Sequence, residues 1–392
     1  MKIAIISNTD WYVWQFRKGL LKSLKEKGHD LFVISPKGDY VELIKNLGIV
    51  HIPVTVDSKG MNPLKDLKIL LDLYKIFKME KFDLIHTFTI KPNIYGAIAG
   101  RLAGIPVVVS SVVGLGYVFS KPNDNLKTRV VNIIATRLYK IAFRYSSCVL
   151  LQNQDDLEFF VSGRLVERGK TQIIKSSGVN LIEYSPLTMD SITIDRLKQE
   201  LSINGNKVVI TMVSRLMWEK GVREFIEAAK ILKSKYPEVF FLLVGGIDKE
   251  NPSAISENYL REAEYNGYIK WLGHRDDVVN ILAISDIVTL PSYYREGVPK
   301  VILEAMAMGK PIVTTNNVGC KDTVEEGKNG FLVHVKDHVA LSERIERLIV
   351  NKKLREDFGK YSRLKVEREF DENEVIKETL KVYRVISKKV SP

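Results

Sequence analysis

The sequence predicts an α/β protein built from two parallel-sheet domains in tandem. Three observations carry this prediction. Short apolar runs alternate with longer amphipathic segments in two separate series, and a loop-like stretch at residues 176–186 interrupts them. Strands that alternate with helices form parallel sheets covered on both faces. The length of 392 residues also favours two domains, because one domain typically holds roughly 100–200 residues.

The first series begins with a buried strand at residues 2–7 and a helix at 17–27, whose apolar residues share one face. Asn62 and Pro63 are a helix cap and a first-turn proline, and they open a long amphipathic helix that ends near residue 79. The other elements predicted here are strand 31–34, helix 40–47, strands 50–53 and 83–86, helix 93–103, strand 107–110, helix 125–145 and strand 148–151.

The second series follows a polar helical stretch. Its predicted elements are strand 207–213, helix 222–235, strands 239–244 and 268–271, helix 276–284, strand 287–290, helix 299–308 and strands 311–314 and 330–335. Charged amphipathic helices complete the chain from about residue 338. We expect a first domain at 1–180, a second at 181–370, and a C-terminal helix at 371–392 that packs back on the first. Ligands bind at the carboxyl ends of such strands, so two facing domains would offer a cleft.

Positive charge is concentrated in the first domain. The net charge is +12, and residues 1–180 hold 26 Lys and Arg against 15 Asp and Glu, a net of +11. The remaining residues hold 33 against 32, a net of +1. A basic domain suggests nucleic acid, an acidic membrane face or a phosphorylated substrate as partner, and a plain solvated surface is the simpler alternative.

Several classes of protein are disfavoured. Two distant cysteines, Cys148 and Cys320, suggest a reducing compartment and argue against a disulfide scaffold or a Cys-rich metal site. The N-terminal apolar run is too short for a signal peptide, and no run approaches the roughly 20 apolar residues of a membrane span. We therefore expect a cytoplasmic protein with peripheral membrane contact. Neither G-x-G-x-x-G at the first strand nor a Walker A sequence is present, so nicotinamide and P-loop ATP chemistry are unsupported.

Two clusters in the second domain carry candidate chemistry. Arg215 and Lys220 lie between a strand and a helix, where two cations and a helix N-terminus suit a diphosphate. Glu296 precedes and Glu304 lies inside the helix that follows strand 287–290, and carboxylates there can accept hydrogen bonds from sugar hydroxyls. Gly297 permits close backbone approach. Taken singly, each of these residues is more simply a solvated charge or an ion-pair partner.

The spacing Glu296-(seven residues)-Glu304, with Gly-Val-Pro inside it and Gly309-Lys-Pro311 after it, resembles the donor-site motif of family 4 retaining glycosyltransferases. That family has the GT-B fold, with two Rossmann-like domains facing a central cleft. The resemblance covers essentially the whole chain, through Ser214-Arg215, Lys220-Gly221 and Asn329-Gly-Phe-Leu-Val333. Within the family, the sequence is most similar to bacterial enzymes that extend polyprenyl-diphosphate-linked oligosaccharides with UDP-N-acetylhexosamines, UDP-N-acetylgalactosamine among them.

The resemblance implies roles for matching residues. Arg215 and Lys220 would hold the donor diphosphate, and Glu296 would contact the transferred sugar. Further donor contacts are implied for Ser214, Gly273, His274, Arg275, Gly297, Val298, Pro299 and Glu304, with Glu304 on the ribose and residues 273–275 around the uracil. A UDP-sugar substrate, retention of anomeric configuration, and the absence of any metal or cofactor are also implied, because two fixed cations can stabilise the leaving UDP.

The acceptor, a polyprenyl-diphosphate glycolipid, is implied to bind the first domain. Arg17, Lys91, Gly114 and Gly116 are the candidates, and the loop after the first strand is expected to carry aromatic Trp11, Tyr12, Trp14 and Phe16. The histidine that many family members have after the fifth strand is absent here, and His86 is a weaker substitute. Helix 125–145 mixes aliphatic and basic side chains, which fits an anionic membrane surface and a core-facing helix equally well.

Two other functions share this fold: a sugar-nucleotide 2-epimerase, which would need no acceptor, and a transferase with a small soluble acceptor. A nucleic-acid-binding protein is suggested by charge alone. Because no recognised RNA or DNA module is present, we expect no nucleic-acid partner. The expected location is the inner face of the cell membrane.

Overall fold

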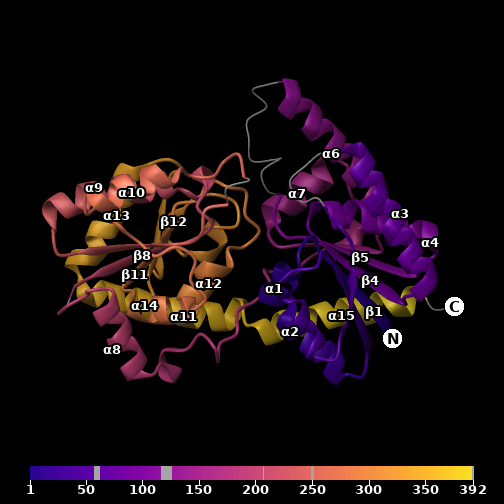
Figure 1. The fold of residues 1–392 in the computed structure, drawn as a ribbon, viewed down its shortest axis with the longest axis horizontal. Coiled ribbons are helices and arrows are strands. Elements are labelled where there is room, and N and C mark those ends of the chain that lie inside the picture. The colour runs from indigo at the N-terminus through magenta and orange to yellow at the C-terminus, as the bar shows by residue number, and fades with distance from the viewer. Residues whose placement is uncertain (57–61, 116–125, 206, 249–250, 391–392) are drawn as a thin grey trace. The chain divides into compact units, whose positions relative to one another are not determined.

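The computed structural model describes residues 1–56, 62–115, 126–205, 207–248 and 251–390 (Figure 1). The chain forms two compact units. Unit 1 comprises Met1–Ser177 and Glu372–Pro392, and unit 2 comprises Gly178–Asp371. Unit 2 is therefore inserted in the sequence of unit 1. The boundaries drawn from the sequence, at residues 180 and 370, lie close to the two positions at which the chain passes from one unit to the other.

Unit 1 contains a parallel seven-stranded sheet in the order β3-β2-β1-β4-β5-β6-β7. Ile5 of β1 lies opposite Val33 of β2 on one side and His86 of β4 on the other. The strand order reverses between β1 and β4, which is where open α/β sheets bind their ligands. The strands are β1 (Lys2–Ile6), β2 (Asp30–Ser35), β3 (Val50–Pro53), β4 (Leu84–Phe88), β5 (Val107–Val112), β6 (Cys148–Leu151) and β7 (Thr171–Ile173).

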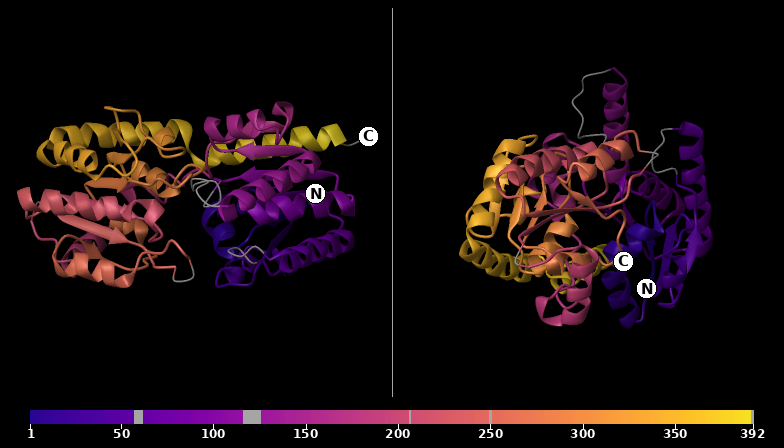
Figure 2. Two further views of the ribbon diagram at one scale, coloured as in Figure 1. Left: turned by 90° about the horizontal axis from the view of Figure 1, so that it is seen from above. Right: turned by 60° about the vertical axis from the view of Figure 1, so that its left-hand side comes forward.

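Helices cover both faces of this sheet, because its strands are apolar on both sides. One core is shared with α3 (Pro63–Glu80), α4 (Ala97–Ala103), α6 (Leu126–Tyr145) and α7 (Gln154–Ser162). The opposite core is shared with α1 (Asp10–Glu26), α2 (Val41–Lys45) and α15 (Glu372–Val390). Figure 2 shows α15, in yellow, running beside the indigo and magenta elements of this unit. Val375, Val382 and Tyr383 anchor it there.

The first helix is longer than the sequence pattern predicts. We expected it from residue 17, with the aromatic residues in a loop, but α1 begins at Asp10. Thr9 is the cap, since its hydroxyl accepts a hydrogen bond from the Tyr12 N–H at 3.1 Å. The predicted helix 93–103 also differs from the observed structure, because its first residues belong to the π-helical turn Pro92–Gly96. Helix α7 and strand β7 were not predicted.

Unit 2 contains a parallel six-stranded sheet in the order β10-β9-β8-β11-β12-β13. Its order reverses between β8 and β11, in the same way as in unit 1. Val288 of β11 lies opposite Thr211 of β8 and Ile312 of β12. The strands are β8 (Val209–Val213), β9 (Phe240–Val244), β10 (Lys270–Trp271), β11 (Ile287–Leu290), β12 (Ile312–Thr315) and β13 (Gly330–Val333).

Two apolar cores flank this second sheet. The smaller joins α8 (Ser191–Glu200) and α11 (Val278–Ile284) to Val209 and Leu242. The larger takes in α9 (Val222–Lys235), α10 (Glu257–Tyr265), α12 (Lys300–Ala307), α13 (His338–Val350) and α14 (Lys352–Glu369). Helix α9 has the bounds that its periodicity predicts, whereas α10 was not predicted. No helix in the described part of the chain is both long and apolar enough to cross a bilayer.

Candidate active site

Two loops of unit 2 leave neighbouring strands at the point where the strand order reverses. Residues 214–221 follow β8 and residues 291–299 follow β11, and these two strands are paired. The loops meet through an ion pair, with Lys220 Nζ 2.5 Å from Glu296 Oε1. Both side chains are mostly buried, at 12% and 11% exposure. The structure thus joins two clusters that the sequence analysis identified separately.

The same oxygen of Glu296 accepts from a second donor. The Ser292 hydroxyl lies 3.0 Å from Glu296 Oε1. The Ser292 carbonyl in turn accepts a hydrogen bond from the Thr315 hydroxyl at the end of β12. Lys220 Nζ lies 5.0 Å from the centroid of the Tyr294 ring, within reach of a cation–π contact. Thr315 was not singled out in the sequence, because only the sheet order brings it to this loop, whereas Ser292 lies four residues before Glu296 and was given no role of its own.

Glycine is required at two places where these loops touch. Gly221 has φ +82°, and a Cβ there would lie 2.1 Å from the Pro291 carbonyl oxygen. Gly319, after β12, has φ +78°, and a Cβ there would lie 1.7 Å from the Gly297 carbonyl oxygen. Any side chain would collide with backbone at either position. The loops that carry Lys220 and Glu296 are therefore fixed by direct backbone packing.

Glu304 lies on α12 and is only 9% exposed. Burial raises the pKa of its carboxyl, while the nearby Lys300 ammonium and a hydrogen bond from the Tyr184 hydroxyl lower it. Tyr184 is itself fixed, because Arg363 donates to its backbone carbonyl at 3.0 Å. Tyr184 lies in the loop-like stretch of the sequence, where nothing marked it as a partner of Glu304. Buried Glu304 and partly buried Tyr184 form a donor–acceptor pair inside unit 2.

The other residues predicted to bind the sugar donor lie in different surroundings from one another. Arg215 is exposed, and in the described ranges no carboxylate pairs with it. The Ser214 N–H donates to the Val244 carbonyl, and the Gly273 carbonyl accepts from the Gly245 N–H at 2.7 Å. His274 is exposed, with Nε2 3.3 Å from Asp276. These backbone bonds hold the ends of β8, β9 and β10 together.

The Arg275 guanidinium is already paired with two carboxylates. Its guanidinium donates to both oxygens of Asp277, at 2.7 and 2.8 Å, and to Glu200 at 2.9 Å. The hydrogen bonds to Asp277 are the main reason that the pKa of Arg275 is raised. Arg275 therefore braces α8 against the start of α11. A direct contact of its guanidinium with uracil would have to use the two N–H donors that these three bonds leave.

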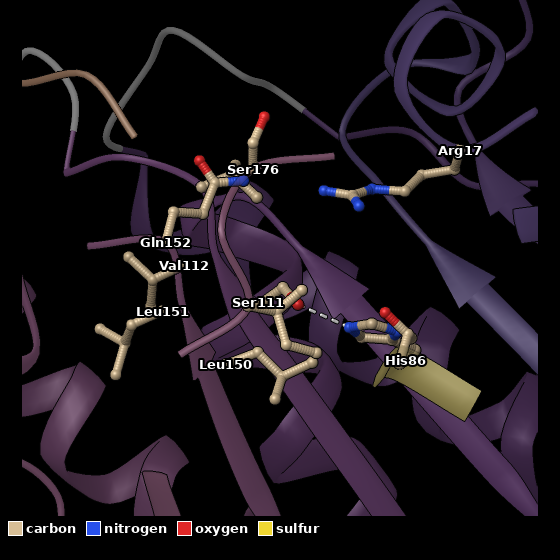
Figure 3. Close-up of a pocket in the computed structure, with 11 residues that line it drawn as sticks. Arg17, His86, Ser111, Val112, Leu150, Leu151, Gln152 and Ser176 are labelled. Carbon is tan, nitrogen blue, oxygen red and sulfur yellow. Dashed lines mark hydrogen bonds between the residues drawn. The ribbon is translucent and has the colours of Figure 1, made fainter. Parts of the chain in front are cut away.

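In unit 1, Arg17 and His86 line one recess at the carboxyl side of the sheet (Figure 3). The Arg17 guanidinium lies 4.2 Å from the Phe88 ring centroid and donates to the Tyr12 hydroxyl at 2.8 Å. His86 is buried between the Tyr383 hydroxyl, 2.5 Å from Nδ1, and the Ser111 hydroxyl, 2.6 Å from Nε2. Burial, with a smaller effect of Arg17, holds the pKa of His86 well below its ordinary value. His86 is therefore neutral.

The remaining acceptor candidates are less open. Lys91 Nζ lies 2.7 Å from Asp66, and both side chains are largely buried, so its charge is compensated. Gly114 has φ +121°, and Gly116 lies outside the described residues. Trp11 is 41% exposed, whereas Trp14 and Phe16 pack against the core. Within the described ranges, no group of three His, Cys, Asp or Glu residues is arranged to hold a metal ion.

Two Rossmann-type units of this kind make up the GT-B fold of glycosyltransferases. Two protein-family models match the chain: "Glycosyl transferase 4-like" over residues 2–153 and "Glycosyl transferases group 1" over residues 193–365. The chain belongs to the group 1 glycosyltransferases. This assignment and the GT-B fold confirm the resemblance that the sequence motifs indicated.

Known relatives match over most or all of the chain. It is 33% identical over 390 residues, 100% of both chains, to the N,N'-diacetylbacillosaminyl-diphospho-undecaprenol alpha-1,3-N-acetylgalactosaminyltransferase of Campylobacter jejuni. It is 33% identical over 282 residues to the UDP-Gal:alpha-D-GlcNAc-diphosphoundecaprenol alpha-1,3-galactosyltransferase of Escherichia coli, covering 71% of this chain and 69% of that protein. The crystal structure of HepE from Anabaena in complex with UDP is similar in fold, with a TM-score of 0.78, 23% identity, and coverage of 98% of this chain and 100% of that one.

Proposed function

We propose that the protein transfers an N-acetylhexosamine, with retention of configuration, from a UDP-sugar to a saccharide carried on polyprenyl diphosphate. The observation that carries this proposal is the buried Lys220–Glu296 pair, at 2.5 Å, where the strand order of unit 2 reverses. The names of the Campylobacter jejuni and Escherichia coli relatives support it, since both describe transfer to a sugar on diphospho-undecaprenol.

The pair suggests how a donor would be received. A diphosphate offers Lys220 a doubly charged partner in place of Glu296, and the exposed Arg215 supplies a second cation. Glu296, kept in place by Ser292, would then accept hydrogen bonds from the sugar. Glu304 would accept from the ribose hydroxyls, with Tyr184 holding its carboxylate. The backbone of Gly297, Val298 and Pro299 would line the diphosphate at the start of α12.

The same groups suggest how the reaction proceeds. The bond between the anomeric carbon and the phosphate oxygen breaks, and a bond to the acceptor oxygen forms on the same face. The acceptor hydroxyl proton passes to the departing phosphate oxygen, so no protein nucleophile is needed. Lys220 and Arg215 neutralise the charge that develops on UDP, which a metal ion does in other enzymes. We therefore propose that transfer is independent of metal ions and of any cofactor.

The acceptor lipid requires access to a membrane, and α6 has a surface suited to one. Its Tyr139, Ala142 and Phe143 face the core, whereas Val130, Ile133, Ile134 and Ile141 are 44–46% exposed. The exposed Arg129, Arg137, Lys140 and Arg144 lie among these aliphatic residues. A helix with this exposed composition binds anionic interfaces. We propose that unit 1 docks here on the inner face of the cell membrane.

A screen of UDP-sugars, with and without isoprenyl-diphosphate saccharides, tests the proposal. We expect acceptor-dependent UDP release with a UDP-N-acetylhexosamine, unaffected by EDTA. Release of a 2-epimer without acceptor would indicate the epimerase alternative, and transfer to soluble saccharides alone would indicate a soluble acceptor. No UDP release with any donor would overturn the proposal.

A further inference from the structure

The loop between β8 and α9 pairs with residues 251–255, which lie between β9 and α10. The Ile255 N–H donates to the Leu216 carbonyl at 3.1 Å, and the Trp218 N–H donates to the Ser253 carbonyl at the same distance. An isolated antiparallel bridge lies between these two contacts. The backbone that leads to the cationic end of this loop is therefore held in place by a segment far away in the sequence.

Residues 251–254 form a tight turn that fixes Ser253. Asn251 accepts twice, its side-chain oxygen from the Ser253 N–H and its carbonyl from the Ala254 N–H, each at 2.9 Å. Pro252 occupies the second position of this turn, where its restricted φ favours the turned backbone. The Asn-Pro-Ser sequence therefore presents the Ser253 side chain from a backbone that is already rigid.

Ser253 reaches the residue that precedes Lys220. Its hydroxyl donates to Glu219 Oε1 at 2.6 Å, and the two residues are buried, at 6% and 8% exposure. A short hydrogen bond from a hydroxyl to a carboxylate is stronger than one between neutral groups. Ser253 thus holds two consecutive residues of the other loop, Trp218 through its carbonyl and Glu219 through its hydroxyl.

The Glu219 carbonyl extends these contacts to the loop that carries Glu296. It accepts from the N–H groups of Tyr293 and Tyr294, at 2.9 and 3.0 Å. The Ser292 hydroxyl, which contacts Glu296 Oε1, lies 3.2 Å from the same carbonyl. Glu219 is therefore fixed by one loop through its side chain and by another through its backbone.

Glu219 is a costly residue for a turn with a purely structural role. Its second carboxylate oxygen, Oε2, is buried and has no hydrogen-bond partner in the described part of the chain. A buried polar atom without a partner lowers stability, and an apolar side chain would fill the space without that cost. Such groups are retained mainly where they serve a site. The next residue is Lys220, whose ammonium meets Glu296 at 2.5 Å.

We propose that Ser253 and Glu219 are positioning residues of the donor site. Their hydrogen bond sets the backbone of the turn so that Lys220 lies against Glu296 and within reach of the donor diphosphate. Neither Ser253 nor Glu219 touches the donor in this proposal. The effect on diphosphate binding rests on the proposed function, whereas the effect on the turn does not.

Calorimetric titration of the full chain with UDP tests the proposal. Ser253→Ala should weaken UDP binding roughly fivefold or more, because the turn no longer holds Lys220 in one position. Ser285→Ala is the matched control. The Ser285 hydroxyl is also buried and lies 2.6 Å from the Thr211 hydroxyl, but it precedes β11, at the end of the sheet opposite these loops.

Both variants lose buried hydrogen bonding in unit 2, so thermal unfolding should show similar decreases in melting temperature. Only Ser253→Ala should lose UDP affinity. Equal UDP affinity in Ser253→Ala and Ser285→Ala would overturn the proposal, because the loss would then be one of stability alone.

A double-mutant cycle tests whether the two residues act as one unit. Glu219→Ala should also weaken UDP binding, and Ser253→Ala added to it should cause little further loss, because their hydrogen bond is already gone. Losses that multiply would overturn the pairing. In turnover, Ser253→Ala should lower kcat/KM for the UDP-sugar and leave the acceptor KM unchanged. A raised acceptor KM would contradict a role confined to the donor site.

Hydrogen exchange separates a failure of this proposal from a failure of the proposed function. The Tyr293 and Tyr294 amides, which donate to Glu219, should exchange roughly fivefold faster or more in Ser253→Ala, and at their normal rate in Ser285→Ala. Unchanged exchange in Ser253→Ala would overturn the positioning role whether or not UDP binds. If the unmodified protein binds no UDP but the amides respond, the positioning of the turn holds and the proposed function fails.

Discussion

Lys220 and Glu296 are each other's partner, with Nζ and Oε1 2.5 Å apart. In the proposed function Lys220 would bind the diphosphate and Glu296 the sugar, and each keeps hydrogen-bonding capacity beyond their mutual contact. The pair also compensates both charges in a site where the two side chains are mostly buried. Groups held in this way need little rearrangement to act together in catalysis.

Glu296→Gln should slow transfer strongly and leave the fold intact. The amide removes the charge that pairs with Lys220 but keeps the size of the side chain. We expect kcat to fall by roughly 10²–10³, the range for loss of one electrostatic contact to a transition state. UDP release and circular dichroism measure the two effects. Glu346→Gln, which breaks the exposed pair with Lys235, is the control, and turnover near normal in Glu296→Gln would remove this residue from the site.

Lys220→Gln should weaken binding of UDP more than it affects stability. A hydrogen bond to a charged group contributes about 1.5–3 kcal/mol, which corresponds to a loss of affinity of roughly 10- to 150-fold. Calorimetric titration with UDP measures it. Lys230→Gln removes a lysine from the partly buried pair with Glu227 and should bind UDP normally. Equal affinity of the two variants would contradict the assignment of Lys220 to the diphosphate.

Gly319→Ala should disrupt the loop that carries Gly297. The new Cβ would meet the Gly297 carbonyl oxygen, so the backbone beside Glu296 must move. Gly327→Ala is a matched control, because Gly327 also has a positive φ, +75°, but a Cβ there meets nothing within 4 Å. Both variants carry a backbone strain of about 1–3 kcal/mol, and only Gly319→Ala should also lose UDP-sugar turnover. Equal turnover in the two would show that this contact does not position the site.

Lys310 should make stability depend on pH above neutrality. Burial lowers its pKa to about 8 from the ordinary 10.5, although Asp286 partly opposes this. Between these values the unfolded chain binds more protons than the folded one, so stability rises with pH. Relative to Lys310→Met, the free energy of unfolding should rise by roughly 1–2 kcal/mol from about pH 7.5 to about pH 9.5 in urea titrations. Lys352→Met, at a lysine side chain 81% exposed, should show no such difference, and a flat comparison for Lys310→Met would refute the prediction.

The exposed face of α6 should mediate binding to anionic membranes. Ile133→Glu combined with Ile134→Glu places two acids among the basic residues there, and should reduce co-sedimentation with anionic liposomes at low salt. Salt should weaken binding of the unmodified protein, because the basic residues act through screened charge. Leu187→Glu alters a residue of unit 2 that is 95% exposed and should have no effect. Absence of binding at low salt would reject the membrane proposal.

Much of the fold could be predicted from periodicity. Helix α9 was predicted with its observed bounds, and the strands of both sheets fell close to theirs, apart from β7. The start of α1 was missed because four bulky aromatic or β-branched residues follow Asp10, which hides the helical period. The capping pair Thr9 and Asp10 was the available signal. Short elements such as β7 have too few residues for a period to show.

The candidate site was predictable in part, for a physical reason. Lys220 and Glu296 could be placed near each other because both follow strands of one parallel sheet. Thr315 and Tyr184 could not, since their roles depend on contacts between segments far apart in the sequence, and Ser292, in the same loop as Glu296, was assigned no role. The pairing of Arg275 with Asp277 and Glu200 could not be predicted from the sequence either. Local sequence shows which groups carry charge, and only packing shows which of these charges are already paired with an opposite charge.

Helix α15 completes unit 1 with residues that follow all of unit 2 in the sequence. The Tyr383 hydroxyl that holds His86, and some of the apolar side chains that cover one side of the first sheet, are therefore synthesised only after unit 2. Domains generally fold during synthesis in the order in which they emerge. Unit 2 is contiguous in sequence and can fold first, whereas unit 1 must remain incomplete until α15 has been synthesised.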